Sequence, residues 1–493
     1  MKRNILYRNF LNSWDLIVLG IFAFLTRFLN LSFPSRVVFD EAHFGLYATK
    51  YFSHQYYFDI HPPLGKMLLA VAGFFGKIKA GFNFEPNGAY GDFNFLALRI
   101  LPALFGSLLI LLIYLFVKEL GFSKRVAFLS GALVLLDNAL LVQSRLILMD
   151  IILVFFIFLS LYLFILSRKS LPFSSKWYFL NMALVISLGT VISIKWTGFG
   201  ALALIWFLTI LKDKLFSKPK KELYIKLGLI FLAPLLIYFL IFSIHFYLLQ
   251  KSCAKDCGAA LERFLNPQKF FLTQSVDAFT YGNNPPSGNL LDKFFTVNFF
   301  MLGSNFDDSA AYIYQSDWWN WPLMSRPVLY FKEPQDSKTS FIYFIGNPFV
   351  WGASIIGIIG YFYLIVKNFL FKFKLKIPKS FYSENFLLLI AGYLFYFLPF
   401  LSIKRYMLIY HYLPALIFSI IIFSVFFEGL LEMIFGPSNK NKILFPSKRA
   451  NAVFIGLLMI ILLSFFYFSP LTYGFPLTNE EFQDRMWLET WEI

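Results

Sequence analysis

Residues 94–117, NFLALRILPALFGSLLILLIYLFV, form an apolar run that is long enough to cross a membrane. A helix needs about 20 apolar residues to span the hydrocarbon core. Backbone groups inside lipid must be hydrogen-bonded within the chain, so this run predicts a transmembrane helix. Ten further apolar runs occur at 14–32, 126–143, 148–166, 178–194, 197–211, 227–249, 343–366, 385–401, 406–430 and 451–468. We therefore predict an all-α polytopic membrane protein with about 11 transmembrane helices in a single membrane domain, 1–493.

The composition agrees with a membrane protein and argues against a soluble fold. Of the 493 residues, 58% are hydrophobic and 21% are aromatic. The net charge of +16 would suggest a nucleic-acid partner in a soluble protein. Here more than half of the 44 Lys and Arg residues fall in alternate short loops between the apolar runs. We predict a lipid bilayer as partner and no nucleic acid.

The distribution of basic residues predicts the orientation of the chain. Lys2, Arg3 and Arg8 precede the first run, which lacks a small-residue cleavage site and therefore indicates an uncleaved span. The positive-inside rule then gives an N-in/C-out topology. The predicted extracytoplasmic parts are a first loop at 33–93, a second loop at 250–342, a short turn at 402–405 and a C-terminal tail at 469–493. We expect the second loop to be a small irregular subdomain with short helices, and MLLAVAGFFGKI in the first loop to lie along the membrane interface.

The first predicted outer loop contains FDEAHFGLYATKYFSHQYYFDIHPPLGK, residues 39–66. Asp40 and Glu41 are followed by a second polar group that includes Asp59, His61 and Lys66. Adjacent carboxylates often only solvate a loop, but ionisable residues at membrane depth are costly, at about 3 kcal/mol each, and usually functional. Nine of them are expected at the level of this loop: Arg27, Arg99, Asp137, Arg145, Asp150, Lys195, Lys404, Arg405 and His411.

One such residue alone is easily explained as a snorkelling side chain or a helix–helix ion pair. Several cations beside a carboxylate loop instead suggest an anionic ligand. At a membrane surface, a lipid phosphate fits this chemistry because Arg can bind two phosphate oxygens at once.

Several sequence blocks resemble the protein O-mannosyltransferases, enzymes of GT-C architecture that use polyprenyl- or dolichyl-phosphate-mannose. The blocks run in order along the whole chain: TRF (26–28), VVFDEAHFG (37–45), HPPLGK (61–66), RILPALFG (99–106), SRLILMD (144–150), SIKWTG (193–198), SDWWNWPLMSRPVLY (316–330), GNPFVWG (346–352), KRYMLIYHYLPAL (404–416) and MWLETW (486–491). A second loop of this length cannot hold the β-trefoil MIR domain of eukaryotic members. The resemblance therefore implies a bacterial form without a MIR domain, in the inner membrane.

The resemblance implies mannose transfer from polyprenyl-phosphate-mannose to Ser or Thr hydroxyls of secreted or membrane proteins, with inversion at the anomeric carbon. An inverting displacement needs one base, and a lipid phosphate leaves as an anion that requires only cations. We predict Asp40 as the general base, with Glu41 beside it to orient the acceptor or a helix end. The unranked candidates for substrate binding are His61, Arg99, Arg145, Lys404, Arg405 and His411, although His61 could also belong to a rigid turn.

The remaining expectations concern cofactors and loop residues. No carboxylate pair or Cys/His set suggests a metal site, so we predict a metal-independent enzyme without a cofactor. Trp318, Trp319 and Trp321 could stack on the sugar or the acceptor, or form an interfacial belt. The sequence leaves open whether Cys253 and Cys257 form a disulfide and whether the protein is a monomer or a dimer.

Two other functions compete with this interpretation. A related GT-C transferase could move another lipid-linked sugar to lipid A or a cell-wall glycan, but such relatives are less similar in the YHYLPAL and WWNWPLMSRP blocks. A lipid-linked sugar flippase would be expected to show internal repeats and charges at the membrane midplane. The charges here are expected at one face, which disfavours transport.

Overall fold

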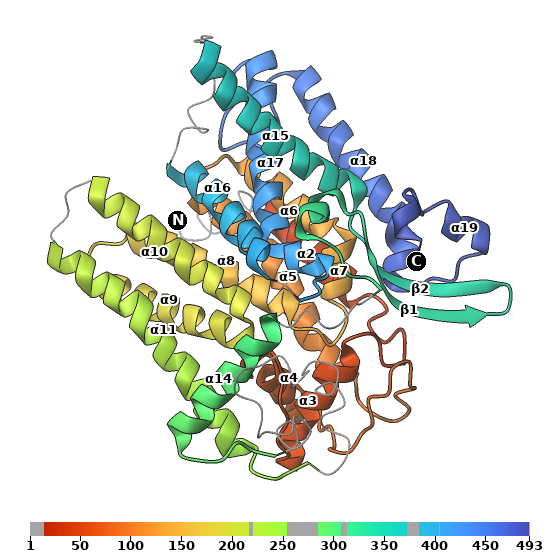
Figure 1. Ribbon diagram of the computed structural model, residues 1–493. Coiled ribbons are helices and arrows are strands. Elements are labelled where there is room, and N and C mark those ends of the chain that lie inside the picture. Colours follow the sequence, from red (N-terminus) through yellow and green to blue (C-terminus); the bar gives the residue numbers. More distant parts are fainter. Residues whose placement is uncertain are drawn as a thin grey trace, which may run out of the picture.

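The computed structural model describes residues 14–215, 220–253, 284–306, 313–371, 384–403 and 405–492. Long helices form a bundle, and shorter elements cover one of its ends (Figure 1). The helices of the bundle are α2 (Trp14–Phe28), α5 (Leu96–Glu119), α6 (Lys124–Leu135), α7 (Asn138–Gln143), α8 (Asp150–Lys169), α9 (Ser175–Ile194), α10 (Phe199–Leu215), α11 (Lys220–Leu248), α15 (Pro348–Phe371), α16 (Glu384–Phe397), α17 (Leu413–Phe435) and α18 (Lys448–Tyr473).

Within the described ranges, eight helical segments are long and apolar enough to cross a membrane. They correspond to eight of the predicted spans and confirm the all-α polytopic fold class. The other three predicted spans coincide with shorter helices, namely α2, the α6–α7 pair and α10. The boundaries also differ at α15, which begins at Pro348 because residues 343–344 belong to a strand.

The predicted span 126–143 is divided in two by a buried acidic residue. Asp137 separates α6 from α7, and its carboxylate accepts a hydrogen bond from Leu140 N at 2.9 Å as the N-cap of α7. It also accepts bonds from Asn347 N at 3.1 Å and Trp351 Nε1 at 2.9 Å. A buried carboxylate needs such donors. Asp137 therefore joins α7 to the start of α15, and its position gives it a structural role.

The helix α17 lies at the centre of the bundle and α11 at its edge. The share of residues buried within the protein is 78% for the span that contains α17 but 22% for the span in α11. Close packing at the centre requires small residues. A Cβ atom at Gly357 in α15 would lie 2.5 Å from the Cα of Phe423 in α17, so only glycine permits this helix crossing.

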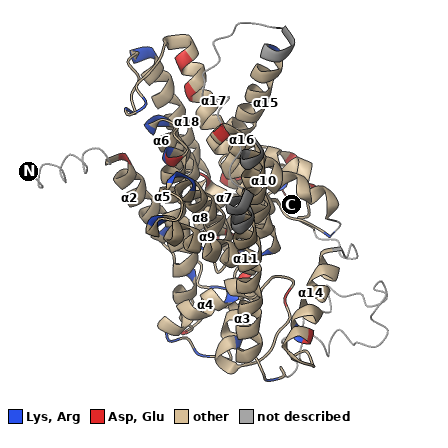
Figure 2. Cartoon of the chain, turned by 90° about the vertical axis from the view of Figure 1, so that its left-hand side faces the viewer, with Lys and Arg blue, Asp and Glu red and all other residues tan. Residues whose placement is uncertain are grey.

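Shorter helices cover one end of the bundle. They are α3 (Glu41–Ser53), α4 (Leu64–Phe75) and α14 (Leu290–Phe306), which lie together at the bottom of the view (Figure 1). The predicted interfacial helix is α4, and Val71, Phe74 and Phe75 on its surface are exposed. Basic residues gather at the opposite end, around the start of α6 and the α17–α18 connection (Figure 2).

The sequence analysis missed a β-hairpin in the predicted second outer loop. Strands β1 (Val328–Gln335) and β2 (Lys338–Phe344) pair antiparallel, with a bulge at Tyr330 between Leu329 and Phe331. Both strands contain β-branched and aromatic residues, but Pro334 argues against a strand in the first of them. The expectation of short helices there is correct for α14 and for the 3₁₀ helix η3 (Trp318–Leu323).

The C-terminal tail holds the hairpin in place. Thr339 of β2 exchanges two backbone hydrogen bonds with Leu477, and the ring of Phe341 stacks on Phe482 of α19 (Asn479–Gln483) at 4.2 Å between centroids. Further along, the indole of Trp491 is 2% exposed and donates a hydrogen bond to Met324 O at 2.7 Å. The tail is therefore part of the packed structure around η3 and the hairpin.

We predict that Trp491→Ala destabilises the protein far more than Trp487→Ala. Trp491 is buried, and replacing a buried Trp by Ala costs about 3–5 kcal/mol. Trp487 is 48% exposed, and substitutions at exposed sites usually change stability by less than about 0.5 kcal/mol. Thermal unfolding of both variants in the same detergent measures the difference. A melting temperature of Trp491→Ala equal to that of the wild type would show that this residue of the tail does not stabilise the fold.

Candidate functional site

Asp40 is the residue immediately before α3, in the segment that connects α2 to α3. Its side chain is partly exposed, and it makes no capping hydrogen bond to its own helix. Within the described part of the chain, no residue donates a hydrogen bond to this carboxylate. The carboxylate is therefore available to a substrate.

The surroundings of Asp40 adjust its proton affinity. Burial raises the pKa of this carboxyl to about 6, while the nearby His43 and Lys195 oppose the rise and Asp150 and Asp59 add to it. Desolvation disfavours the charged form, which is the physical cause of the largest effect. The group is then mostly ionised at neutral pH but binds a proton more readily than an ordinary aspartate.

Glu41, the next residue, has the opposite environment. It is fully buried and forms a bidentate ion pair with Arg99, with both N–O distances at 2.8 Å. Its carboxylate also accepts hydrogen bonds from Val38 N and Ile147 N at 2.9 Å and from the Tyr90 hydroxyl at 3.1 Å. Five donors saturate the carboxylate, so of the two expected roles the contacts favour orienting the end of a helix, at the start of α3, over orienting the acceptor.

Two of the predicted phosphate ligands are likewise bound within the protein. Besides Glu41, Arg99 donates to the carbonyl oxygens of Leu31, Pro34 and Arg36. Arg145 donates to the carbonyl oxygens of Arg27, Leu29 and Asn30, and its guanidinium lies 4.5 Å from the Tyr473 ring centre. Both arginines hold the chain between α2 and α3, and their geometry does not support a contact with substrate.

Three other predicted ligands, His61, Arg405 and His411, lie close enough to interact electrostatically. Burial lowers the pKa of His61 well below its ordinary value, and the positive charges of Lys195, Arg405 and Lys66 add to this effect. His411 belongs to the same group, and its Nδ1 lies 2.8 Å from Leu408 O, which leaves Nε2 available. Lys404, the remaining predicted ligand, lies outside the described residues.

Arg405 differs from the two structural arginines. Its buried Nε has no hydrogen-bond partner in the described ranges, and burial lowers the pKa of this group. A buried N–H group without an acceptor is costly. Arg405 thus places a positive charge beside His61 and His411 that an anionic group can neutralise.

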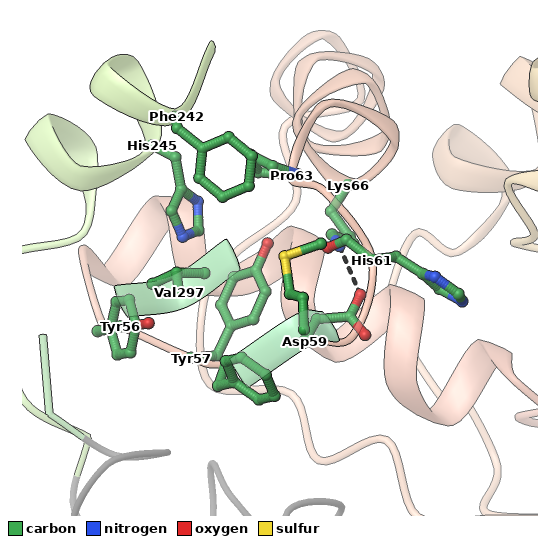
Figure 3. A pocket seen from close by; sticks show the side chains of 11 residues that line it. Tyr56, Tyr57, Asp59, His61, Pro63, Lys66, Phe242, His245 and Val297 are labelled. Carbon is green, nitrogen blue, oxygen red and sulfur yellow. Dashed lines mark hydrogen bonds and ion pairs between the residues drawn. The ribbon is translucent and has the colours of Figure 1, made fainter. Parts of the chain in front are cut away.

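A small cavity adjoins this cationic group. Figure 3 shows Asp59 and Lys66 joined by an ion pair, at 2.5 Å, with the His61 ring directed away from His245 and Tyr57. Lys66 is fully buried and also donates to His61 O at 2.7 Å. The ion pair thus fixes the HPPLGK turn. Lys66 is therefore part of the framework.

Two residues near Asp40 are not among the predicted site residues. Lys195, which the sequence indicates only as a charge at membrane depth, forms an ion pair with Asp150 at 2.7 Å beside Asp40. Tyr330, in the unpredicted hairpin, stacks on Phe39 at 4.1 Å between ring centroids. The SIKWTG block contains Lys195 and could have indicated it as a site residue. No pattern in the sequence predicts the contact between Tyr330 and Phe39.

The tryptophans of the WWNW segment do not act together. Trp321 is fully buried, stacked near His411 and packed against Phe400, so it cannot stack on a ligand. Trp318 packs on Phe397, whereas Trp319 is 55% exposed. Cys253 is disulfide-bonded, and Cys257 lies outside the described residues.

We predict that Glu41→Gln destabilises the protein strongly, whereas Asp40→Asn does not. Removing the charge of Glu41 leaves Arg99 as an unpaired buried cation, which costs about 3–5 kcal/mol. The carboxylate of Asp40 has no hydrogen bond to the described residues that it could lose. Thermal unfolding of the two adjacent variants in detergent tests this contrast. A melting temperature for Glu41→Gln equal to that of the wild type would contradict the structural role of the pair.

The fold has solved relatives. The protein O-mannosyltransferase complex Pmt1–Pmt2 of Saccharomyces cerevisiae, solved with its sugar donor, matches with a TM-score of 0.81 and 21% identity over 98% of this chain and 93% of that one. The oligosaccharyltransferase of Archaeoglobus fulgidus matches with a TM-score of 0.55 and 14% identity over 95% of this chain and 56% of that one. These likenesses assign the GT-C fold.

Sequence comparison is more specific. Dolichyl-phosphate-mannose–protein mannosyltransferases 1 and 2 of Candida albicans are 36% and 30% identical over 55% and 62% of this chain. The alignments span only 31% and 42% of those relatives. A family model for dolichyl-phosphate-mannose-protein mannosyltransferases matches residues 17–250, and one for the C-terminal four-helix membrane region of protein O-mannosyltransferases matches residues 290–491. Because the two models together match most of the chain, it belongs to the protein O-mannosyltransferases, a family of glycosyltransferases.

Proposed function

We propose that this protein transfers mannose from a polyprenyl-phosphate-mannose donor to Ser or Thr hydroxyls of proteins, with inversion at the anomeric carbon. The names of its relatives support the donor and the protein acceptor. The observation that carries the mechanism is the unbonded carboxylate of Asp40 near Lys195, with Arg405 and two histidines grouped around the same lysine.

In the proposed reaction, Asp40 accepts the proton of the acceptor hydroxyl as its oxygen bonds to the anomeric carbon. The bond between that carbon and the phosphate oxygen breaks at the same time, and the lipid phosphate leaves as an anion. His61, Arg405 and His411 bind this phosphate, with Lys195 beside them. Arg405 and Lys195 are cations that face the developing negative charge and stabilise the transition state. The bound phosphate also favours the protonated forms of His61 and His411, which can then donate hydrogen bonds to it. We propose that the reaction needs no metal and no cofactor.

The proposed location follows from the predicted topology. With the N-terminus inside, Asp40 and the α3–α4 end of the bundle lie on the extracytoplasmic face. We propose the inner membrane of a bacterium as the site of action, because the 250–342 loop is short for a MIR domain. The alternative acceptors, lipid A or a cell-wall glycan, are distinguished by the experiment below.

We predict that the purified protein labels Ser or Thr residues of secreted proteins from radiolabelled polyprenyl-phosphate-mannose, with EDTA present. Asp40→Asn should lower transfer by about 10²–10⁴-fold while it still binds donor, because only the base is lost. The matched control is Lys293→Gln, a change at a surface residue of α14. Label that enters only lipid or glycan would overturn the acceptor. Transfer to protein that survives Asp40→Asn would overturn the base, and a requirement for a divalent ion would overturn metal independence.

We predict that activity falls as the pH drops below about 6. Asp40 must be unprotonated to accept a proton, and its raised pKa of about 6 places the loss of activity there and not near the ordinary value of about 3.9. The pH dependence of kcat/KM for the acceptor reports this group in the free enzyme. Activity that stays constant from pH 7 down to pH 5 would contradict the assignment.

A further inference from the structure

Phe39, which precedes Asp40, has an unusual backbone conformation. Its φ is +48°, in the left-handed region that residues with bulky side chains rarely adopt. Such a conformation persists only where the surrounding structure holds it, and it is found most often at functional sites. The chain enters α3 two residues later, at Glu41. The backbone conformation at Phe39 therefore sets the direction in which the Asp40 side chain points.

The helix itself does not orient Asp40. An aspartate before a helix usually has an extended backbone, and its carboxylate accepts a hydrogen bond from an amide of the first turn. Asp40 instead has φ −68° and ψ −3° and makes no such bond. The first-turn amides bond to backbone oxygens: Ala42 N donates to Phe39 O at 3.2 Å, and His43 N donates to Asp40 O at 3.0 Å. What fixes the carboxylate must therefore lie before it in the chain.

The ring of Phe39 is held by the hairpin. It stacks on Tyr330 with the centroids 4.1 Å apart and the planes at 9°, and Tyr410 approaches its edge at 6.4 Å. Tyr330 is only 4% exposed, and its hydroxyl accepts a hydrogen bond from Gln143 Nε2 at 2.8 Å. Tyr330 is also the residue at the bulge of β1. Bulges commonly redirect one side chain beside an active site, and here the redirected side chain is the one that contacts Phe39.

Two further contacts join the segment before Asp40 to strand β1. Arg36 forms an ion pair with Glu333 at 2.7 Å, and Phe33 meets Phe331 edge to face at 6.3 Å. Residues 33–39 thus lie against residues 330–333 of β1 at three points, and the contact at Phe39 is the one next to the carboxylate.

We propose that Phe39, held by Tyr330, is a positioning residue that aims Asp40 at the acceptor hydroxyl. The proposal rests on the proposed function. The stack keeps Phe39 in its left-handed conformation, and that conformation directs the carboxylate toward the site. The hairpin thereby contributes to the geometry of proton transfer.

The test compares Phe39→Gly and Phe39→Ala with Tyr330→Leu and Tyr330→Phe in the mannose-transfer assay. Glycine adopts a positive φ freely, so Phe39→Gly removes the ring without straining the backbone. We expect kcat to fall about 100-fold in Phe39→Gly, Phe39→Ala and Tyr330→Leu, because a displacement of about 1 Å in a catalytic group costs this much. Tyr330→Phe keeps the ring and should retain kcat. Donor KM should not change in any of the four variants.

A second measurement separates positioning from a general loss of structure. In Phe39→Gly, the released carboxylate becomes more solvated, so the acid limb of kcat/KM should move from about pH 6 toward the ordinary carboxyl value. Phe482→Leu, which removes the stack on Phe341 of β2 but leaves the contact between Phe39 and Tyr330, should leave the limb unchanged. Wild-type kcat in Phe39→Gly, or a lower kcat with an unmoved limb and a raised donor KM, would overturn the proposal. A wild-type protein that transfers nothing to protein would instead overturn the proposed function.

Discussion

The buried ion pair between Glu41 and Arg99 is the interaction on which the rest of the site depends. Neither side chain is exposed, and the hydrogen bonds of the pair extend to backbone groups before α3 and at Ile147. Removing either partner would leave a charge in a medium that cannot solvate it. The pair therefore fixes the path of residues 31–41 and the start of α3, and the position of Asp40 is a consequence of that path.

The two adjacent acids have different roles because their surroundings differ. Glu41 is surrounded by donors and held in one position, whereas the Asp40 carboxylate accepts no hydrogen bond from the described residues and lies near Lys195. The same contrast separates the arginines. Arg99 and Arg145 are bonded to carboxylate or carbonyl groups, and Arg405 keeps a buried nitrogen without a partner. Among these two acids and three arginines, the groups that keep an unbonded polar atom lie at the candidate site, and the fully bonded ones belong to its framework.

The sequence allowed the fold class to be predicted because apolar length is a direct requirement of the bilayer. Local patterns also placed Asp40, His61, Arg405 and His411, since a charge at membrane depth is costly enough to be informative. What the sequence could not show is how each charge is paired. Arg99 and Arg405 are the same residue type in similar apolar surroundings, and only the fold shows that one meets Glu41. The contact between Phe39 and Tyr330 was equally hidden, because it joins segments almost 300 residues apart through an irregular bulge.

The most direct test of the account is chemical rescue of the missing base. Mannose transfer to a protein acceptor would be measured for Asp40→Ala with and without added formate, with Glu41→Ala treated in the same way. If Asp40 is the base, its alanine variant is slow by about 100-fold or more and formate restores part of the rate, because a small carboxylate can occupy the vacated space. Formate should not restore Glu41→Ala, whose defect is structural. Transfer by Asp40→Ala at the wild-type rate without formate would contradict the central claim.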